Sequence, residues 1–300
     1  MSLSLELQKK FLNSEHTGEY VSFDIPVEVN AKGGSSTASR SMSLHYMDEG
    51  EGAPIILIHS IGQSMYTWRK LFPLLSENYR VIAFDLPGHG YSSRVDGFNY
   101  SIPVMADIIK RLMDALKLQS AHLVGFGFGA LYALDVTRQF PKRVGKLILM
   151  SPGGLTSDIP SKLHMLDNAI FGRLVSLTYG VRTIESLLQS CFFDLTHLTP
   201  DVVSEYYKTL ADPESRYAIY KTCRNFDDHE TMSFLRKLDH EVVLMRGTED
   251  KWRSAAYIDQ FEACLKNVRR LDIRNTGHLL HEEKPQRLSD VFSSLLTTSL

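Results

Sequence analysis

The chain has 300 residues, of which 43% are hydrophobic and 23% charged, and its formal net charge at pH 7 is −2. This composition is ordinary for a soluble globular protein, and the length allows one large α/β domain or two smaller ones. A charge so close to zero excludes the basic footprint of a protein that binds nucleic acid or an anionic membrane surface.

The three cysteines, Cys191, Cys223 and Cys264, are too widely spaced to form a metal-ligand pair. Such spacing and an odd number are typical of reduced thiols, so we expect a cytoplasmic protein with no metal site. Residues 1–20 are polar and charged and contain no apolar stretch of signal-peptide length. No segment approaches the roughly 20 apolar residues that a membrane-spanning helix requires.

The first predicted elements are strands. Residues 19–29 and 40–48 alternate weakly between apolar and polar side chains, and the glycines and serines of 32–36 predict a turn between them. We therefore expect an antiparallel pair. The continuous apolar runs 55–58 and 81–84 predict parallel strands that are buried on both faces.

Helical patterns alternate with the next strands. One helix is predicted around Trp68 to Leu75, and another over 102–117, where apolar residues recur with the 3.6-residue period. An apolar run over 121–126 then ends in closely spaced glycines, and an alanine-containing helical pattern follows at once. This order predicts a strand, a sharp turn and a helix, with a further strand over 146–150.

The alternation stops after residue 154. Residues 155–227 show only helical patterns, including one with Leu163, Leu166, Ile170 and Leu174 and one that begins at Thr199-Pro200. The alternation of strands and helices resumes with strands over 242–245 and 268–273, a helix around Phe261 and a final helix. We predict an α/β fold in which residues 1–154 and 228–300 form a mostly parallel sheet flanked by helices. Residues 155–227 are predicted to form a helical lid over the carboxyl edge of this sheet.

Two mechanisms place glycines directly after a strand in the manner of residues 125–130. One is the nucleophile elbow G-x-S-x-G, which lifts a serine above a parallel sheet. The other is the dinucleotide fingerprint G-x-G-x-x-G/A, which Gly125, Gly127 and Ala130 satisfy. The fingerprint normally follows the first strand of its unit and needs an acidic residue about 20 positions later. Here the next strand ends in Leu149-Met150-Ser151-Pro152, without an acid, so the elbow is favoured.

Four more motifs accompany the elbow: His59 after a strand, Asp-Leu-Pro-Gly-His-Gly-Tyr-Ser over 85–92, Arg-Gly-Thr-Glu-Asp over 246–250, and Asn-Thr-Gly-His over 275–278. With these five motifs in this order, the chain resembles lid-bearing α/β hydrolases of the esterase, epoxide-hydrolase and carbon–carbon hydrolase type. The resemblance spans roughly residues 45–295. It implies the α/β-hydrolase fold and a small-molecule ligand beneath the lid, with no cofactor.

Carried over residue by residue, the resemblance implies that Asp250 is the triad acid and His278 the base. It implies an oxyanion hole made by the backbone N–H groups of Ile61 and Phe128. Two positions depart from the family pattern. Gly127 occupies the nucleophile position, and Ser60 stands where a glycine usually follows the histidine.

Each departure has more than one interpretation. The elbow residue is expected at positive φ, so Gly127 relaxes the turn while it removes the nucleophile, through natural change or an engineered substitution. Ser60 is a candidate ligand contact or a displaced nucleophile. An elbow without serine also occurs in the N-myc downstream-regulated proteins, a non-catalytic branch of the fold.

The functional expectation follows from these residues. We expect a protein of the hydrolase family that acts on a small, largely apolar carbonyl or ester compound, silent or strongly impaired because position 127 holds glycine. Two alternatives remain open. One is a pseudoenzyme that binds a ligand or partner without turnover. The other is a lyase or cofactor-free oxygenase that uses His278 and Asp250 as a base pair.

Overall fold

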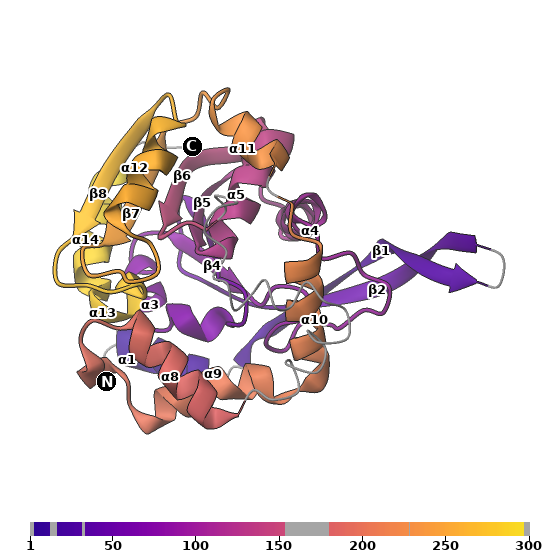
Figure 1. Ribbon diagram of the computed structural model, residues 1–300, viewed down its shortest axis with the longest axis horizontal. Helices are drawn as coiled ribbons and strands as arrows, with labels where there is room; N and C mark the ends of the chain where they lie inside the picture. The colour runs from indigo at the N-terminus through magenta and orange to yellow at the C-terminus, as the bar shows by residue number, and fades with distance from the viewer. Residues whose placement is uncertain (1–2, 13–16, 32–33, 154–179, 228, 297–300) are drawn as a thin grey trace.

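The computed structural model describes residues 3–12, 17–31, 34–153, 180–227 and 229–296. Within this part of the chain, an eight-stranded sheet runs through the molecule in the order β1-β2-β4-β3-β5-β6-β7-β8 (Figure 1). The strands are β1 (Glu19–Ala31), β2 (Gly34–Glu49), β3 (Pro54–Ile58), β4 (Arg80–Phe84), β5 (Ala121–Phe126), β6 (Val144–Met150), β7 (Val242–Gly247) and β8 (Val268–Ile273).

Strand β2 pairs antiparallel with both β1 and β4, whereas all pairings from β4 through β8 are parallel. The prediction of a mostly parallel sheet is therefore confirmed. Helices connect and cover these strands. They are α1 (Leu3–Leu12), η1 (Met65–Trp68), α3 (Phe72–Leu75), α4 (Ile102–Ala115), α5 (Phe128–Gln139), η2 (Pro141–Arg143), α8 (Val181–Cys191), η5 (Leu195–His197), α9 (Pro200–Ala211), α10 (Pro213–Arg224), α11 (His229–Leu235), α12 (Ala255–Ala263), α13 (Leu280–Glu283) and α14 (Pro285–Leu295).

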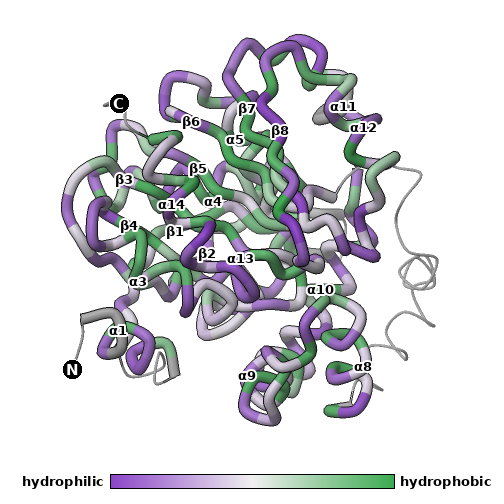
Figure 2. Tube along the Cα trace, turned by 90° about the vertical axis from the view of Figure 1, so that its left-hand side faces the viewer, coloured by the Kyte–Doolittle hydropathy of each residue, from purple (hydrophilic) through white to green (hydrophobic). Residues whose placement is uncertain are grey.

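Strand β3 shows why its apolar run is continuous. Ile55 and Leu57 join one hydrophobic cluster with α1, α3 and α14, whereas Ile56 and Ile58 join a second cluster with α4 and α5. Successive side chains of a strand point to opposite faces, so a strand covered on both sides must be apolar throughout. Figure 2 shows apolar residues concentrated along β3 and β5.

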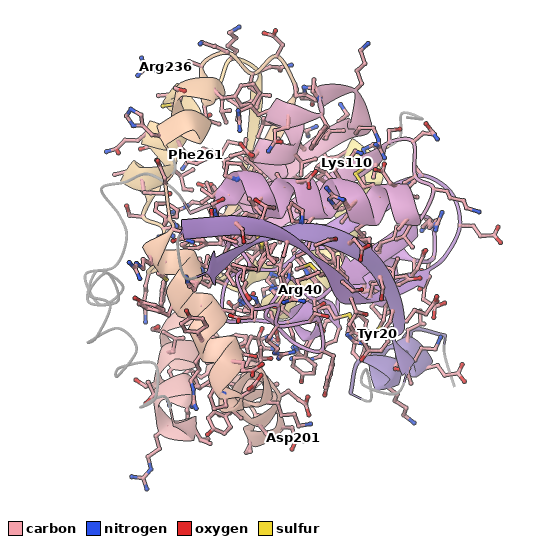
Figure 3. All side chains as sticks on the ribbon, turned by 90° about the vertical axis from the view of Figure 1, so that its right-hand side faces the viewer. Tyr20, Arg40, Lys110, Asp201, Arg236 and Phe261 are labelled. Atoms are coloured by element: carbon pink, nitrogen blue, oxygen red, sulfur yellow. The ribbon has the colours of Figure 1, made fainter. Side chains whose placement is uncertain are left out.

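The first hairpin is longer than its sequence pattern indicates. The turn predicted over 32–36 is wrong in its second half, because residues 34–36 already belong to β2 and pair with 29–31 of β1. The ladder between the two strands is made by backbone groups, so it extends through residues 34–36 without a pattern of apolar side chains. The ribbon projects beyond the sheet (Figure 1), and Figure 3 shows it from that side, with Arg40 on β2 below Lys110 on α4.

Two helices also differ from the predicted bounds. The helix expected around Trp68 to Leu75 is divided into η1 and α3, because Pro73 fits the first turn of a helix but not an interior position. The helix predicted over 102–117 ends at Ala115, and Lys117 takes a left-handed φ of 57° that terminates it.

Residues 180–227, within the segment predicted as a lid, contain only helical elements. Thr199 caps α9 as expected, since its Oγ1 accepts a hydrogen bond from the Val202 N–H at 3.3 Å. The pattern with Leu163, Leu166, Ile170 and Leu174 lies outside the described residues. Helices α8 and α9 lie to one side of the sheet in both views (Figures 1 and 2). None of the described helices has the length and apolar character to cross a membrane.

Candidate active site

The predicted site residues lie on loops that follow four strands of one parallel array. His59 to Ile61 follow β3, Gly127 follows β5, Asp250 follows β7 and His278 follows β8. Parallel strands present their carboxyl ends at the same edge of a sheet, so these loops meet there. The edge is also where ligands bind in folds of this architecture.

The turn after β5 has the geometry of a nucleophile elbow. Gly127 has φ 55° and ψ −116°, which confirms the positive φ expected from the motif. Its N–H donates to the Met150 carbonyl at 3.0 Å, and its carbonyl accepts from the N–H groups of Ala130 at 3.2 Å and Gly153 at 3.1 Å. A non-glycine residue in this conformation costs on the order of 1–3 kcal/mol. Glycine adopts it without that cost.

At the two outer glycines of the motif, neighbouring backbone atoms leave no room for a side chain. A Cβ on Gly125 would lie 2.4 Å from the Gly129 carbonyl oxygen, and a Cβ on Gly129 would lie 2.3 Å from the Ile58 carbonyl oxygen. Backbone atoms cannot yield as the end of a side chain can. Gly125 therefore allows close packing of β5 against α5, and Gly129 allows close packing of α5 against the end of β3.

Ser60 lies directly against the elbow. Its Oγ accepts a hydrogen bond from the Phe128 N–H at 3.1 Å. A Cβ placed on Gly127 would lie 2.4 Å from Ser60 Oγ and 2.9 Å from Ser60 Cβ. The serine hydroxyl thus occupies space that a side chain at position 127 would need. It also engages one of the two N–H groups predicted to form an oxyanion hole.

His59 holds the Ser60 backbone in place. The His59 Nε2 accepts from the Leu86 N–H at 2.9 Å, which leaves Nδ1 to donate to the Ser60 carbonyl at 2.7 Å. Burial holds the pKa of His59 below its usual value despite the opposing effect of Asp85, so the ring stays neutral. The Ser60 N–H donates to Gln63 Oε1 at 3.2 Å, and Ile61 lies within the same turn.

Asp250 and His278 form a buried pair. His278 Nδ1 lies 2.9 Å from Asp250 Oδ2, while Asp250 Oδ1 accepts the backbone N–H groups of Trp252 at 2.8 Å and Arg253 at 3.0 Å. Burial by itself raises the pKa of the Asp250 carboxyl. His278 and the hydrogen-bond donors outweigh this effect and hold that pKa below its usual value. Asp250 is therefore ionised and fixes the His278 ring orientation.

The end of helix α8 is attached to both loops of this pair. The His278 N–H donates to the Cys191 carbonyl at 2.7 Å, and Trp252 Nε1 donates to Ser190 Oγ at 3.0 Å. The Trp252 indole also stacks on the His278 ring, with centroids 5.7 Å apart. Part of the predicted lid is therefore joined to the carboxyl edge of the sheet.

Glu283 is a structural contributor that the sequence analysis missed. One of its carboxylate oxygens accepts from the Gly277 N–H at 2.7 Å, and the other accepts from Phe193 at 3.2 Å and Asp194 at 3.0 Å. It thus fixes the residue before His278 and the chain after α8 together. Glu283 is one of two adjacent glutamates, and nothing in its local sequence distinguishes it from Glu282 in this role.

Tyr206, in the segment predicted as a lid, forms a buried polar network with residues of η1, the residue after it and α13. Its hydroxyl donates to Glu282 Oε1 at 2.5 Å and lies 2.8 Å from Thr67 Oγ1, while Arg69 Nη2 donates to Glu282 Oε2 at 2.6 Å. The network joins α9 to α13 and η1. It positions helices and leaves the Tyr206 hydroxyl committed to protein partners.

The described residues place no hydrogen bond between the Ser60 hydroxyl and the His278 imidazole. They also hold no group of three or more His, Cys, Asp or Glu side chains arranged to bind a metal ion. The site thus combines an ionised acid and its histidine, an elbow without a hydroxyl, and a serine hydroxyl that binds the elbow from the neighbouring loop. Such a set can bind a carbonyl oxygen and accept a proton.

Some of the curated relatives are named as hydrolases of oxo-dienoates. A 2-hydroxy-6-oxo-6-phenylhexa-2,4-dienoate hydrolase of Comamonas testosteroni is 32% identical over 171 residues, which are 56% of this chain and 59% of that relative. The match therefore spans less than two thirds of that relative's length. A 2-hydroxy-6-oxo-2,4-heptadienoate hydrolase of Pseudomonas putida is 27% identical over 232 residues, 74% of this chain and 81% of the relative.

Solved structures and a family profile extend the likeness to most of the chain. The meta-cleavage product hydrolase of Pseudomonas fluorescens IP01 superposes with a TM-score of 0.73 at 25% identity, covering 85% of this chain and 94% of the other. The profile of the alpha/beta hydrolase fold family matches residues 53–285, which include the elbow, Asp250 and His278. The sheet order, the elbow geometry and this match agree: the chain belongs to the α/β hydrolase fold family.

Proposed function

We propose that this chain binds a small, largely apolar carbonyl or ester compound above the elbow and does not hydrolyse it by the covalent route. The observation that carries the proposal is the combination of a formed Asp250–His278 pair with Gly127 at the nucleophile position. Removing the nucleophile of a serine protease costs about 10⁶-fold in turnover. We therefore expect ester hydrolysis by the chain to be silent or strongly impaired.

The relatives support the choice of ligand. The Comamonas and Pseudomonas putida proteins are named as hydrolases of conjugated oxo compounds, one of them bearing a phenyl group. A carbonyl oxygen is also what the Ser60 hydroxyl is suited to contact. Its Oγ accepts from Phe128, so its own proton is available for a ligand oxygen.

A second candidate function is base catalysis without a covalent intermediate. The 2.9 Å bond from His278 to Asp250 supports it, because an ionised aspartate orients the imidazole to accept a proton at Nε2. In that case a carbonyl compound loses a proton to His278, as in a lyase or a cofactor-free oxygenase. A pseudoenzyme that only binds is the outcome if no conversion depends on His278.

Repair of the elbow tests the main proposal. We expect Gly127→Ser alone to regain little activity, because its Cβ would collide with Ser60 Oγ at 2.4 Å, and to lose stability by about 1–3 kcal/mol from positive φ. Adding Ser60→Gly removes the collision and frees the Phe128 N–H. The double variant should hydrolyse p-nitrophenyl acetate measurably above either single variant.

Ser60→Gly alone is the matched control, since it opens the site without supplying a nucleophile. A folded double variant that stays inert would indicate that the site is remodelled for binding. Labelling of the unmodified protein with a fluorophosphonate provides a second readout. Stoichiometric labelling at Ser60 would contradict the proposal and identify Ser60 as a displaced nucleophile.

A further inference from the structure

Arg253 is a buried guanidinium on the loop that carries Asp250. Arg253 is only 7% exposed, and two of its side-chain nitrogens donate to backbone carbonyls. Nε donates to the Pro152 oxygen at 2.9 Å and Nη1 to the Trp252 oxygen at 2.9 Å. The second terminal nitrogen, Nη2, has no hydrogen-bond partner among the described residues.

The charge of Arg253 lacks an ion-pair partner within the described part of the chain. The neighbouring Arg246, by contrast, lies 3.6 Å from Asp272. The Asp250 carboxylate is the closest acid in sequence, but its oxygens bind His278 and the backbone N–H groups of Trp252 and Arg253. The guanidinium carbon also lies 5.0 Å from the centroid of the Tyr257 ring, but this contact supplies no formal negative charge. A buried cation that has no counter-charge among the described residues is costly, so an anionic ligand group would stabilise it.

The Nη2 nitrogen lies beside the elbow. A Cβ on Gly153 would be 3.1 Å from Arg253 Nη2, 3.7 Å from the Gly127 carbonyl oxygen and 3.7 Å from a ring carbon of Phe128. The Gly153 N–H in turn donates to the Gly127 carbonyl at 3.1 Å. The guanidinium therefore lies close to the elbow, and Gly153 has no side chain that would separate them.

We propose that Arg253 Nη2 binds an anionic oxygen of the ligand, so that the ligand is a carbonyl compound with a carboxylate at one end. This inference rests on the proposed function and adds the ligand's charge and orientation to it. A guanidinium already held by two carbonyls presents its remaining N–H groups in a fixed direction. That arrangement favours a carboxylate over a neutral group of the same shape.

The test compares two probes that differ only in charge, 3-benzoylpropionate and its primary amide, by isothermal titration at low salt. We expect the unmodified protein to bind the carboxylate about tenfold or more tightly than the amide, with a preference that decreases as salt is added. Arg253→Gln should abolish the preference and leave the affinity for the amide unchanged. Arg253→Lys should retain part of it, because the charge remains without the planar geometry.

Lys251→Gln is the matched control, since it removes an exposed positive charge two residues away and should leave the preference intact. If Arg253→Gln fails to fold, Arg253→Lys and the salt dependence of the unmodified protein still decide the question. Equal affinity for both probes, or an equal loss for both in Arg253→Gln, would contradict this inference alone. Binding of neither probe would contradict the proposed function and the inference with it.

Discussion

Positions 60 and 127 hold a serine and a glycine where the family pattern has the reverse. The Ser60 hydroxyl lies where a side chain at position 127 would otherwise lie. The Ser60 hydroxyl accepts a hydrogen bond from the Phe128 N–H, and it can lie there because Gly127 has no side chain. Residues in such direct contact do not act additively when they are changed. The effect of either substitution therefore has meaning only together with the residue at the other position.

His278→Ala separates the functions that remain open for the site. A panel of esters, lactones, β-diketones and aromatic ketones is first screened by thermal shift and then by product formation. If His278 acts as a base, the variant should lose all turnover of a bound compound while its affinity stays nearly unchanged. If the protein only binds, the variant should change affinity by about 0.5–1.5 kcal/mol, the net value of one hydrogen bond.

Asp250→Asn serves as the companion variant, because it preserves the shape of the Asp250 side chain but not its charge. A working base should lose activity in this variant as well. Ligands that bind and raise the melting temperature, but are converted by neither the unmodified protein nor the variants, would show that the pair does no chemistry.

At the scale of the elements, α8 connects the helical segment to the site. The end of α8 contacts the Asp250 loop through Ser190 and the His278 loop through Cys191. Beyond the helix, Glu283 accepts hydrogen bonds from the N–H groups of Phe193 and Asp194. Burial raises the pKa of the Cys191 thiol to about 12, so this cysteine stays protonated and packs as an apolar group. The helix thus positions the His278 loop through a backbone hydrogen bond and the Asp250 loop through a hydrogen bond between the Ser190 and Trp252 side chains.

Glu283→Ala should loosen this connection. The change leaves the N–H groups of Gly277, Phe193 and Asp194 without their acceptor, which should cost about 1–3 kcal/mol of unfolding free energy. Hydrogen exchange at Gly277 and Asp194 should accelerate more than at strand β5. Glu262→Ala is a suitable control, because its half-exposed ion pair with Arg270 is worth at most about 1 kcal/mol. Unchanged exchange at Gly277 would show that Glu283 does not hold the His278 loop.

At the scale of the whole molecule, buried histidines set the response to acid. Burial lowers the pKa of His89 and His281 to about 3 and that of His122 to about 4. The unfolded chain, with a histidine pKa of about 6.5, binds protons at these positions well before the folded protein does. Stability rises with pH wherever the unfolded state holds more protons, so the free energy of unfolding should fall as the pH drops from about 6.5 toward 3.

The buried carboxylates affect the free energy of unfolding at lower pH than the histidines do. The pKa values of Asp85, Asp250 and Glu282 lie below normal, although burial opposes this, because each has charged and hydrogen-bonding partners. Their contribution is present above the unfolded carboxyl pKa of about 4 and is lost as the pH falls through their folded values. Loss of stability between pH 6.5 and 4 is therefore expected from the histidines.

His281→Gln should reduce that loss. Urea unfolding gives the free energy of unfolding at pH 7 and at pH 4.5. The decrease between these two values should be smaller in the variant than in the unmodified protein by roughly 1–3 kcal/mol, because glutamine does not titrate. The variant should also be less stable at pH 7, since the imidazole packs against Trp68 and Phe126 and bonds Thr67. The exposed His229, changed to Gln, is the control. An unaltered pH difference in His281→Gln would contradict the proposed role of its burial.

Much of the fold could be predicted because its signals are local. Short continuous apolar runs such as 55–58 and 81–84 favour a parallel strand that is covered on both faces. The glycines at 125–129 predict a turn, and the structure confirms its positive φ at Gly127. Element ends were less accurate, as at residues 34–36 and 116–117. There the hydrogen-bond ladder or a single left-handed residue decides the boundary.

The sequence by itself determined the order of the strands along the chain, the elbow and the absence of a hydroxyl at Gly127, since each depends on residue type and short-range spacing. Only the tertiary structure decided that Ser60 fills the space beside Gly127, that Glu283 joins α8 to the His278 loop, and that Arg253 borders the elbow. These contacts connect residues from separate loops that the parallel sheet gathers at one edge. No local sequence pattern predicts contacts between separate loops, because these contacts depend on which strands are neighbours in the sheet.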